Sequence, residues 1–229
     1  SVSSVEGTPM HQAYIGSSAN PGFRDYAMVA EIIKSGTLSN HVSLDINPST
    51  RDILQKLITL GPLATLNNAG ARVHQTGCNG CIGMGQAPAT GINSLRTTPR
   101  NFPGRSGTSD DRVWLCSPET AAASALKGKI TDPRRLNILY PLINVPSTGT
   151  IADSLISPPS MGDIVVLPTK IVHGPNIVPL PVISAISDTL EIPVLLSLAD
   201  DVSTDEILPA GAEVLPFRSN IPKIAEFVF

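Results

Sequence analysis

The sequence is poor in aromatic residues and in charge of either sign. Aromatic side chains make up 4% of the 229 residues and charged side chains 15%, and the formal net charge is -3. Because there is no basic stripe, the sequence lacks the electrostatic footprint of a nucleic-acid-binding protein. No apolar run approaches the ~18–20 residues of a membrane span. The N-terminal residues of the sequence have neither the basic segment nor the apolar segment of a secretion signal. We expect a protein of the cytoplasm or mitochondrial matrix with no nucleic-acid or membrane partner.

Cysteine is also scarce. Two of the three cysteines, Cys78 and Cys81, form a Cys-x-x-Cys motif. In an intracellular protein this spacing points to metal or redox chemistry rather than to structural disulfides. The motif alone leaves open a metal site, a redox pair and a turn with two inert thiols. Cys116 lies in an apolar segment and is more typical of a buried structural cysteine.

Proline, in contrast, is abundant. The chain has 21 prolines, and they concentrate between Tyr140 and Pro193. Proline removes a backbone donor and blocks helix interiors, so this stretch predicts a meandering connection. We therefore expect a first domain over residues 1–139, a proline-rich linker over residues 140–190 and a second unit over residues 191–229.

Strand and helix signals alternate along the first domain. Strands are predicted at residues 11–15, 42–46 and 113–116, and helices at residues 24–34 and 51–60 and from Ser117 onward; residues 63–71 fit either a helix or a strand. Such alternation predicts an α/β domain with a parallel sheet and functional loops at the carboxyl ends of its strands. In the second unit, residues 193–198 predict a further strand.

Two of the predicted loops carry chemistry. The first holds the two cysteines among Gly77, Gly80 and Gly83, and glycine lets backbone approach an inorganic centre closely. The second runs from Arg100 to Arg105, whose guanidinium groups match carboxylates in a planar, two-bond geometry. Together they suggest a metal or iron–sulfur centre acting on a small organic acid. His74 lies shortly before the first loop, but a lone histidine is more often a satisfied or exposed side chain.

These motifs resemble the aconitase superfamily. Its signature Cys-x-x-Cys-Ile-Gly is present at residues 78–83, and Arg-Asn-Phe-x-Gly-Arg at residues 100–105. Residues 14–20 resemble the opening of the family's third domain, and residues 202–205 resemble the start of its swivelling fourth domain. The resemblance implies a parallel-sheet aconitase-type domain, a proline-rich linker and the start of a swivel domain, which is incomplete at Phe229.

The resemblance also implies roles for single residues. In the family, three cysteines hold a 4Fe–4S cluster, and Cys78 and Cys81 match two of them while Ser18 stands at the position of the third. Serine oxygen is a poor ligand for an iron–sulfur cluster. Pro99 and Glu206 also depart from the family's usual asparagine and histidine. The implied substrate-binding residues are Arg100, Arg105, Arg218 and Ser17, and the implied catalytic residue is Asp205.

The motifs and their departures from the family pattern leave two alternative functions open. The first is part of a hydro-lyase that dehydrates and rehydrates a hydroxy-di- or tricarboxylate, as in aconitase, homoaconitase or isopropylmalate isomerase. The second is a divergent homologue without a cluster, acting as a pseudoenzyme, a binding module or an enzyme of altered chemistry; Ser18 motivates it. In either case the resemblance covers only part of a family member. The expected partners are a small hydroxy acid and the remaining aconitase-type domains or a partner chain, and the chain alone should be inactive.

Overall fold

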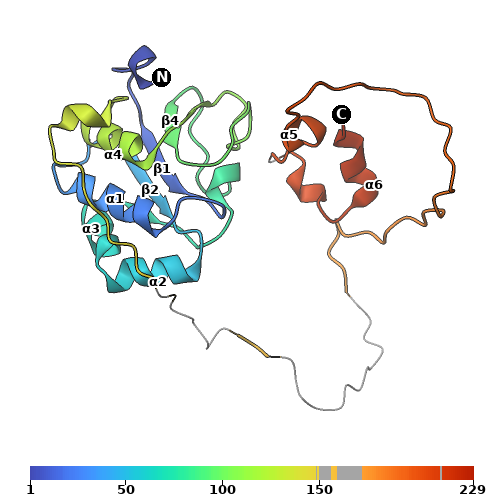
Figure 1. Cartoon of the computed structure of the whole chain (residues 1–229), viewed down its shortest axis with the longest axis horizontal. Helices are drawn as coiled ribbons and strands as arrows, with labels where there is room; N and C mark the ends of the chain where they lie inside the picture. The colour runs from blue at the N-terminus through green and yellow to red at the C-terminus, as the bar shows by residue number, and fades with distance from the viewer. Residues whose placement is uncertain (148, 150–155, 159–171, 212) are drawn as a thin grey trace. The chain divides into compact units, whose positions relative to one another are not determined.

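The computed structural model describes residues 1–147, 149, 156–158, 172–211 and 213–229. The chain divides into two compact units, Ser1–Pro159 and Ser160–Phe229 (Figure 1). Parts of the predicted linker, residues 148, 150–155 and 159–171, lie outside the described residues. The domain limits expected at residues 139 and 190 stay predictions.

The first unit is built on a five-stranded parallel sheet, so the predicted α/β class is confirmed. The strand order is β3-β2-β1-β4-β5, with β1 in the centre. The strands are β1 (Gln12–Gly16), β2 (Ser43–Asn47), β3 (Arg72–Val73), β4 (Asn93–Arg96) and β5 (Arg112–Leu115). All five residues of β1 are buried, as expected for a central parallel strand with both faces covered.

Four helices pack against one another beside the sheet, and two of them begin at side-chain caps. They are α1 (Phe23–Ile33), α2 (Arg51–Thr59), α3 (Pro62–Asn68) and α4 (Pro118–Lys127), with short 3₁₀ turns η1 (Val2–Ser4), η2 (Gly80–Ile82) and η3 (Pro133–Leu136). The side chains of Thr50 and Ser117 accept hydrogen bonds from the first turns of α2 and α4. Helix α1 packs against α3 and α4, and α4 also contacts β1. Buried side chains of these elements, among them Met28, Val29, Ile15 and Leu44, form one hydrophobic core.

The predicted elements of the first unit agree with the structure to within about two residues, apart from three differences. Of residues 63–71, for which helix and strand were both open, residues 63–68 belong to the helix α3. Strands β3 and β4, two and four residues long, were not expected. Strand β3 has too few residues to show a period, and the sequence Asn-Ser-Leu-Arg of β4 has only one apolar residue, so neither carries a hydrophobic pattern that could identify it.

The second unit contains short helical turns in its described residues. These are α5 (Thr204–Ile207), η5 (Leu215–Phe217), α6 (Ile221–Ile224) and η6 (Ala225–Phe227). The rings of Phe217 and Phe227 stack with centroids 5.9 Å apart. The strand expected at residues 193–198 is wrong, because these residues are exposed and have no regular structure. Apolar composition alone does not make a strand, since a strand needs a neighbour for its backbone hydrogen bonds. The assignment of residues 191–229 to a swivel domain stays a prediction.

Among the described residues, no helix is both long enough and apolar enough to cross a membrane.

Candidate functional site

The loops that follow the strands meet at the carboxyl edge of the sheet. Strand β1 lies between β2 and β4, so the chain reverses its direction of travel across the sheet at β1. In open α/β sheets, ligands bind outside the strand ends at such a switch point. The cysteine turn, residues 77–83, comes after β3, and the arginine loop, residues 99–107, comes after β4. Both predicted chemical loops therefore start from this one edge.

The loop after β1 is tied to the end of β4. The Gly16 backbone N–H donates to Thr97 Oγ1 at 3.0 Å, and Asn20 Nδ2 donates to the Thr97 carbonyl at 2.6 Å. Ser17 is 2% exposed, and its hydroxyl oxygen accepts from the Ala19 backbone N–H at 3.2 Å and lies 3.3 Å from Asn20 Oδ1. Ser17 thus shapes this loop, and its predicted contact with substrate stays a prediction.

A buried arginine on β4 holds the cysteine turn in place. Arg96 is fully buried and donates from Nη1 to the Gly80 carbonyl at 2.7 Å and from Nη2 to the Gln86 carbonyl at 2.6 Å. It also donates to Gln12 Oε1 at 2.9 Å, and its guanidinium lies 4.9 Å from the centre of the Tyr14 ring. Burial lowers the pKa of Arg96 and neighbouring Tyr14 opposes that shift. These bonds join the cysteine turn to the central strands.

The cysteine turn brings its two thiols close together. Cys78 Sγ and Cys81 Sγ lie 3.1 Å apart, with Cys78 exposed and Cys81 4% exposed. Burial and the neighbouring Cys78 thiol raise the pKa of Cys81 to about 11, while the charge of Arg105 acts in the opposite direction. Gly80 lies against Tyr14, where an added Cβ would be 2.5 Å from the ring carbon Cε2.

The arginine loop packs directly against the cysteine turn. An added Cβ at Gly83 would lie 2.6 Å from the backbone carbon of Ser106 and 2.7 Å from Gly107 Cα, so the two backbones touch there. Arg105 is 7% exposed and its guanidinium lies 5.8 Å from the centre of the Phe102 ring. Arg100, in contrast, is exposed. The fold thus places the two loops in contact, and the substrate-binding roles of Arg100 and Arg105 stay predictions.

The donor set does not complete a 4Fe–4S site. The described residues contain no group of three histidine, cysteine or acidic side chains that could hold a metal. Ser18, at the position of the missing ligand, is exposed, and its hydroxyl is a poor iron ligand. The cysteine turn and the arginine loop together hold two thiols, and two thiols do not fit a cluster that needs three thiolates.

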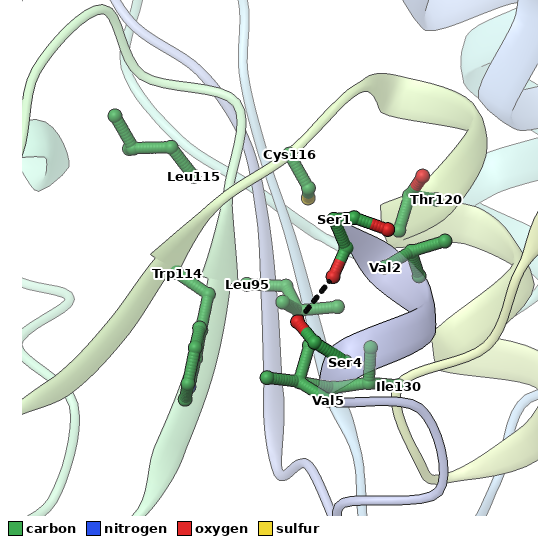
Figure 2. Close-up of a pocket in the computed structure, with 10 residues that line it drawn as sticks. All are labelled: Ser1, Val2, Ser4, Val5, Leu95, Trp114, Leu115, Cys116, Thr120 and Ile130. Atoms are coloured by element: carbon green, nitrogen blue, oxygen red, sulfur yellow. Dashed lines mark hydrogen bonds between the residues drawn. The ribbon is translucent and has the colours of Figure 1, made fainter.

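Cys116 does not fill the gap. It lines a separate hollow of about 280 Å³ between η1, β4, β5 and α4, together with apolar side chains such as Leu95 and Trp114 (Figure 2). None of the residues that line this hollow belongs to the cysteine turn or the arginine loop. Burial, with the charge of Glu119, raises the pKa of Cys116 to about 12. Cys116 therefore lies apart from the two loops, and its role as a structural cysteine stays a prediction.

Asp205 and Arg218 belong to the second unit. The Asp205 backbone N–H donates to Ser203 Oγ at 3.2 Å, and its Oδ1 accepts from the Ala210 N–H at 3.4 Å. Glu206 is part of the same helix start, since its carboxylate accepts from the Ser203 N–H at 2.6 Å. Arg218 is exposed. The catalytic role of Asp205 and the substrate-binding role of Arg218 stay predictions.

The sequence did not reveal the buried polar network beneath the site. Asp45 is fully buried and accepts from His74 Nε2 at 2.9 Å, and Tyr14 donates to the Asn47 side chain. His74 is therefore a satisfied side chain, as a lone histidine usually is. Polar residues inside the predicted strands could have indicated such a network, because a buried polar side chain needs a hydrogen-bond partner. Arg96 was not recognised as part of this network because its strand, β4, was not predicted.

Comparison with known proteins decides the family. The family model described as "Aconitase family (aconitate hydratase)" matches residues 2–128, more than half of the chain. The chain belongs to the aconitase family. The matched segment of this aconitase-family chain contains the whole sheet, the cysteine turn and the arginine loop.

Curated relatives agree with this assignment. The "3-isopropylmalate dehydratase large subunit 1" of Methanopyrus kandleri is 39% identical over 135 residues, which are 58% of this chain and 32% of the relative. The corresponding large subunit of Methanoregula boonei is 40% identical over 136 residues, 59% of this chain and 33% of the relative. That of Sulfurisphaera tokodaii is 40% identical over 138 residues, 59% of this chain and 32% of the relative. The match spans about a third of the length of these relatives.

Proposed function

We propose that this chain supplies the carboxylate-binding part of an aconitase-family hydro-lyase whose substrate is a hydroxy-dicarboxylate of the 3-isopropylmalate type. The observation that carries the proposal is the contact of the arginine loop with the cysteine turn at Gly83 and Ser106. The printed names of the relatives favour 3-isopropylmalate among the hydroxy acids that the superfamily handles.

Arg105 is the centre of the proposed site. It lies in a nearly buried position, where a guanidinium interacts with a carboxylate more strongly than it does in water. Arg100 is the exposed member of the pair and would meet a second carboxylate, with Ser17 at the neighbouring loop. For Arg218 as a further carboxylate ligand and Asp205 as the catalytic residue, the proposal rests on the motif resemblance alone.

The chain's own residues would bind and orient the acid, and removal of the hydroxyl group needs groups beyond them. The family's 4Fe–4S cofactor requires a third ligand that Ser18 does not supply. The remaining catalytic groups would come from other aconitase-type domains or from a partner chain.

Binding to the 229-residue chain tests the proposal. We expect 3-isopropylmalate to shift the backbone amide resonances of the arginine loop in ¹H–¹⁵N spectra in a saturable way. Its dimethyl ester, which keeps the carbon skeleton and the hydroxyl but lacks both charges, should cause no such shifts. Arg105→Lys should weaken binding about 10-fold or more, because lysine cannot form the two-bond fork and a hydrogen bond to a charged group contributes roughly 1.5–3 kcal/mol.

Arg135→Lys is the matched control, since Arg135 is an exposed arginine of η3 and pairs with Glu6 at 3.1 Å. It should leave the affinity unchanged. Equal binding of the acid and its diester, or an unchanged affinity in Arg105→Lys, would contradict the carboxylate role.

A second candidate is a family member that has lost the cluster and keeps only the acid-binding pocket. Ser18 is the observation that favours it. Protein prepared without oxygen should then be colourless and nearly free of iron after incubation with iron(II) and sulfide. About four irons per chain with the brown absorbance of a full cluster would exclude this candidate. Ser18→Cys is the informative variant, because it restores the missing donor and should gain both iron and colour.

A further inference from the structure

We propose that Cys78 and Cys81 form a redox-active dithiol, which small-molecule disulfides such as oxidised glutathione convert into an intramolecular disulfide. The proposal does not depend on carboxylate binding. It concerns the two thiols of the cysteine turn, which lack the third side chain that a metal site would need among the described residues.

The distance between the sulfurs favours a disulfide over a shared metal ion. The two Sγ atoms lie 3.1 Å apart. Closing a disulfide brings them to about 2.05 Å, a movement of about 1 Å. Two thiolates on one tetrahedral metal with bonds of about 2.3 Å would lie about 3.8 Å apart, and thiolates on separate irons of one cluster lie further apart still. The pair is already closer than any shared metal arrangement requires.

Backbone hydrogen bonds hold the pair in this arrangement. The Ile82 N–H donates to the Asn79 carbonyl at 3.0 Å, and the Gly83 N–H donates to the Gly80 carbonyl at 3.1 Å. Arg96 donates to the same Gly80 carbonyl at 2.7 Å from the buried side of the turn. Because the thiols are positioned before reaction, the second step of oxidation is intramolecular and fast.

The two thiols differ in access, which sets their order of reaction. Cys78 is exposed and Cys81 is 4% exposed. Cys78 attacks one sulfur of the small disulfide, forms a mixed disulfide and releases the first thiol. Cys81 then loses its proton and attacks Cys78 Sγ, which forms the Cys78–Cys81 bond and releases the second thiol. In total the protein loses two electrons and two protons, and one small disulfide becomes two thiols.

The test uses the reduced, metal-stripped 229-residue chain and oxidised glutathione under argon. We expect the protein to lose two hydrogens in mass, and peptide mapping to show one Cys78–Cys81 link. Free thiols counted after denaturation should fall from three to one, with Cys116 as the remaining one. Thiols that stay reduced in a glutathione buffer that oxidises free dithiothreitol would overturn the proposal, as would a predominant intermolecular link.

Single variants test the order of reaction. In Cys81→Ser, Cys78 should keep one glutathione as a stable mixed disulfide, because nothing resolves it. In Cys78→Ser, buried Cys81 should take up at least several-fold less glutathione in the same time. Cys116→Ser is the control and should oxidise as the parent chain does, since Cys116 lines a separate hollow. Equal glutathione uptake in the first two variants would overturn the assigned roles.

A metal competition decides between the dithiol and a cluster site. Iron(II) and sulfide added under argon should leave both thiols open to oxidised glutathione. Formation of cluster absorbance together with protection of both cysteines would overturn the proposal.

Discussion

Gly80 sets how closely the cysteine turn approaches the central strand. An added Cβ would lie 2.5 Å from Tyr14 Cε2 and 2.6 Å from Cζ. Tyr14 cannot give way easily, because it is fully buried, donates to the Asn47 side chain and lies beneath the guanidinium of Arg96. At the residue scale, the position of the two thiols therefore depends on the absence of one methyl group.

We expect Gly80→Ala to lower the free energy of unfolding by about 1–3 kcal/mol, the usual cost of forcing extra volume into a packed interior. Urea unfolding followed by circular dichroism measures this change. Gly36→Ala is the control, because its added Cβ would make only an ordinary contact, 3.5 Å from a Leu126 methyl carbon. An effect no larger than that of Gly36→Ala would mean that Tyr14 and the turn can move apart.

Single residues also show how much of the site the sequence could predict. The cysteine and arginine loops were predictable because their residue types and spacing carry the chemistry directly. Arg96 was not, because its importance comes from its partners: the Gly80 and Gln86 carbonyls lie 16 and 10 residues away along the chain. A sequence pattern lists such groups but does not say which of them meet.

At the element scale, the sequence predicted helices better than strands. Helices α2 and α4 have local start signals, a capping Thr50 and a capping Ser117 followed by Pro118. Strands β3 and β4 have none, because a strand's partners lie elsewhere in the chain. The stretch at residues 193–198 shows the converse, since it has strand composition but no partner strand in the described residues of its unit.

The turn η3 begins at a capping residue, Asp132, whose contribution to stability should depend on pH. The Asp132 carboxylate accepts from the Arg134 backbone N–H at 3.0 Å and from Arg134 Nε at 2.9 Å. These hydrogen bonds lower the pKa of Asp132 from its usual 3.8 to about 2. A carboxyl group with a lowered pKa stabilises the folded chain above its unfolded pKa, and this stabilisation is lost as the pH falls from about 4 toward 2.

We therefore expect Asp132→Asn to unfold at a lower urea concentration than the parent chain, by a constant margin above pH 5. That margin should shrink at pH 3, because the unfolded parent chain then binds a proton at Asp132 while the folded chain, with a pKa of about 2, still does not. Added salt should also reduce it, because the Arg134 side chain is 83% exposed. Asp188→Asn, which alters an exposed carboxylate, should show no such margin. A margin that stays constant down to pH 3 would contradict the assigned cause.

At the scale of the whole molecule, the chain covers only part of the length of its relatives. The chain matches about a third of the length of the 3-isopropylmalate dehydratase large subunits. Within it, the thiols and the arginine loop lie in the first unit, whereas Asp205 and Arg218 lie in the second.

We expect the 229-residue chain to bind a hydroxy-dicarboxylate without converting it. Positioning by Arg105 is not sufficient for dehydration, which also needs a group that takes a proton and a group that stabilises the leaving hydroxyl. The thiol pair lacks the third donor of a cluster, so the described residues offer no complete metal centre to stabilise the leaving hydroxyl. The measurement is the ultraviolet absorbance of the unsaturated acid formed from 3-isopropylmalate under argon, with and without added iron(II) and sulfide. Steady product formation by the chain alone would refute this division of labour, whereas saturable binding without product is the result that it requires.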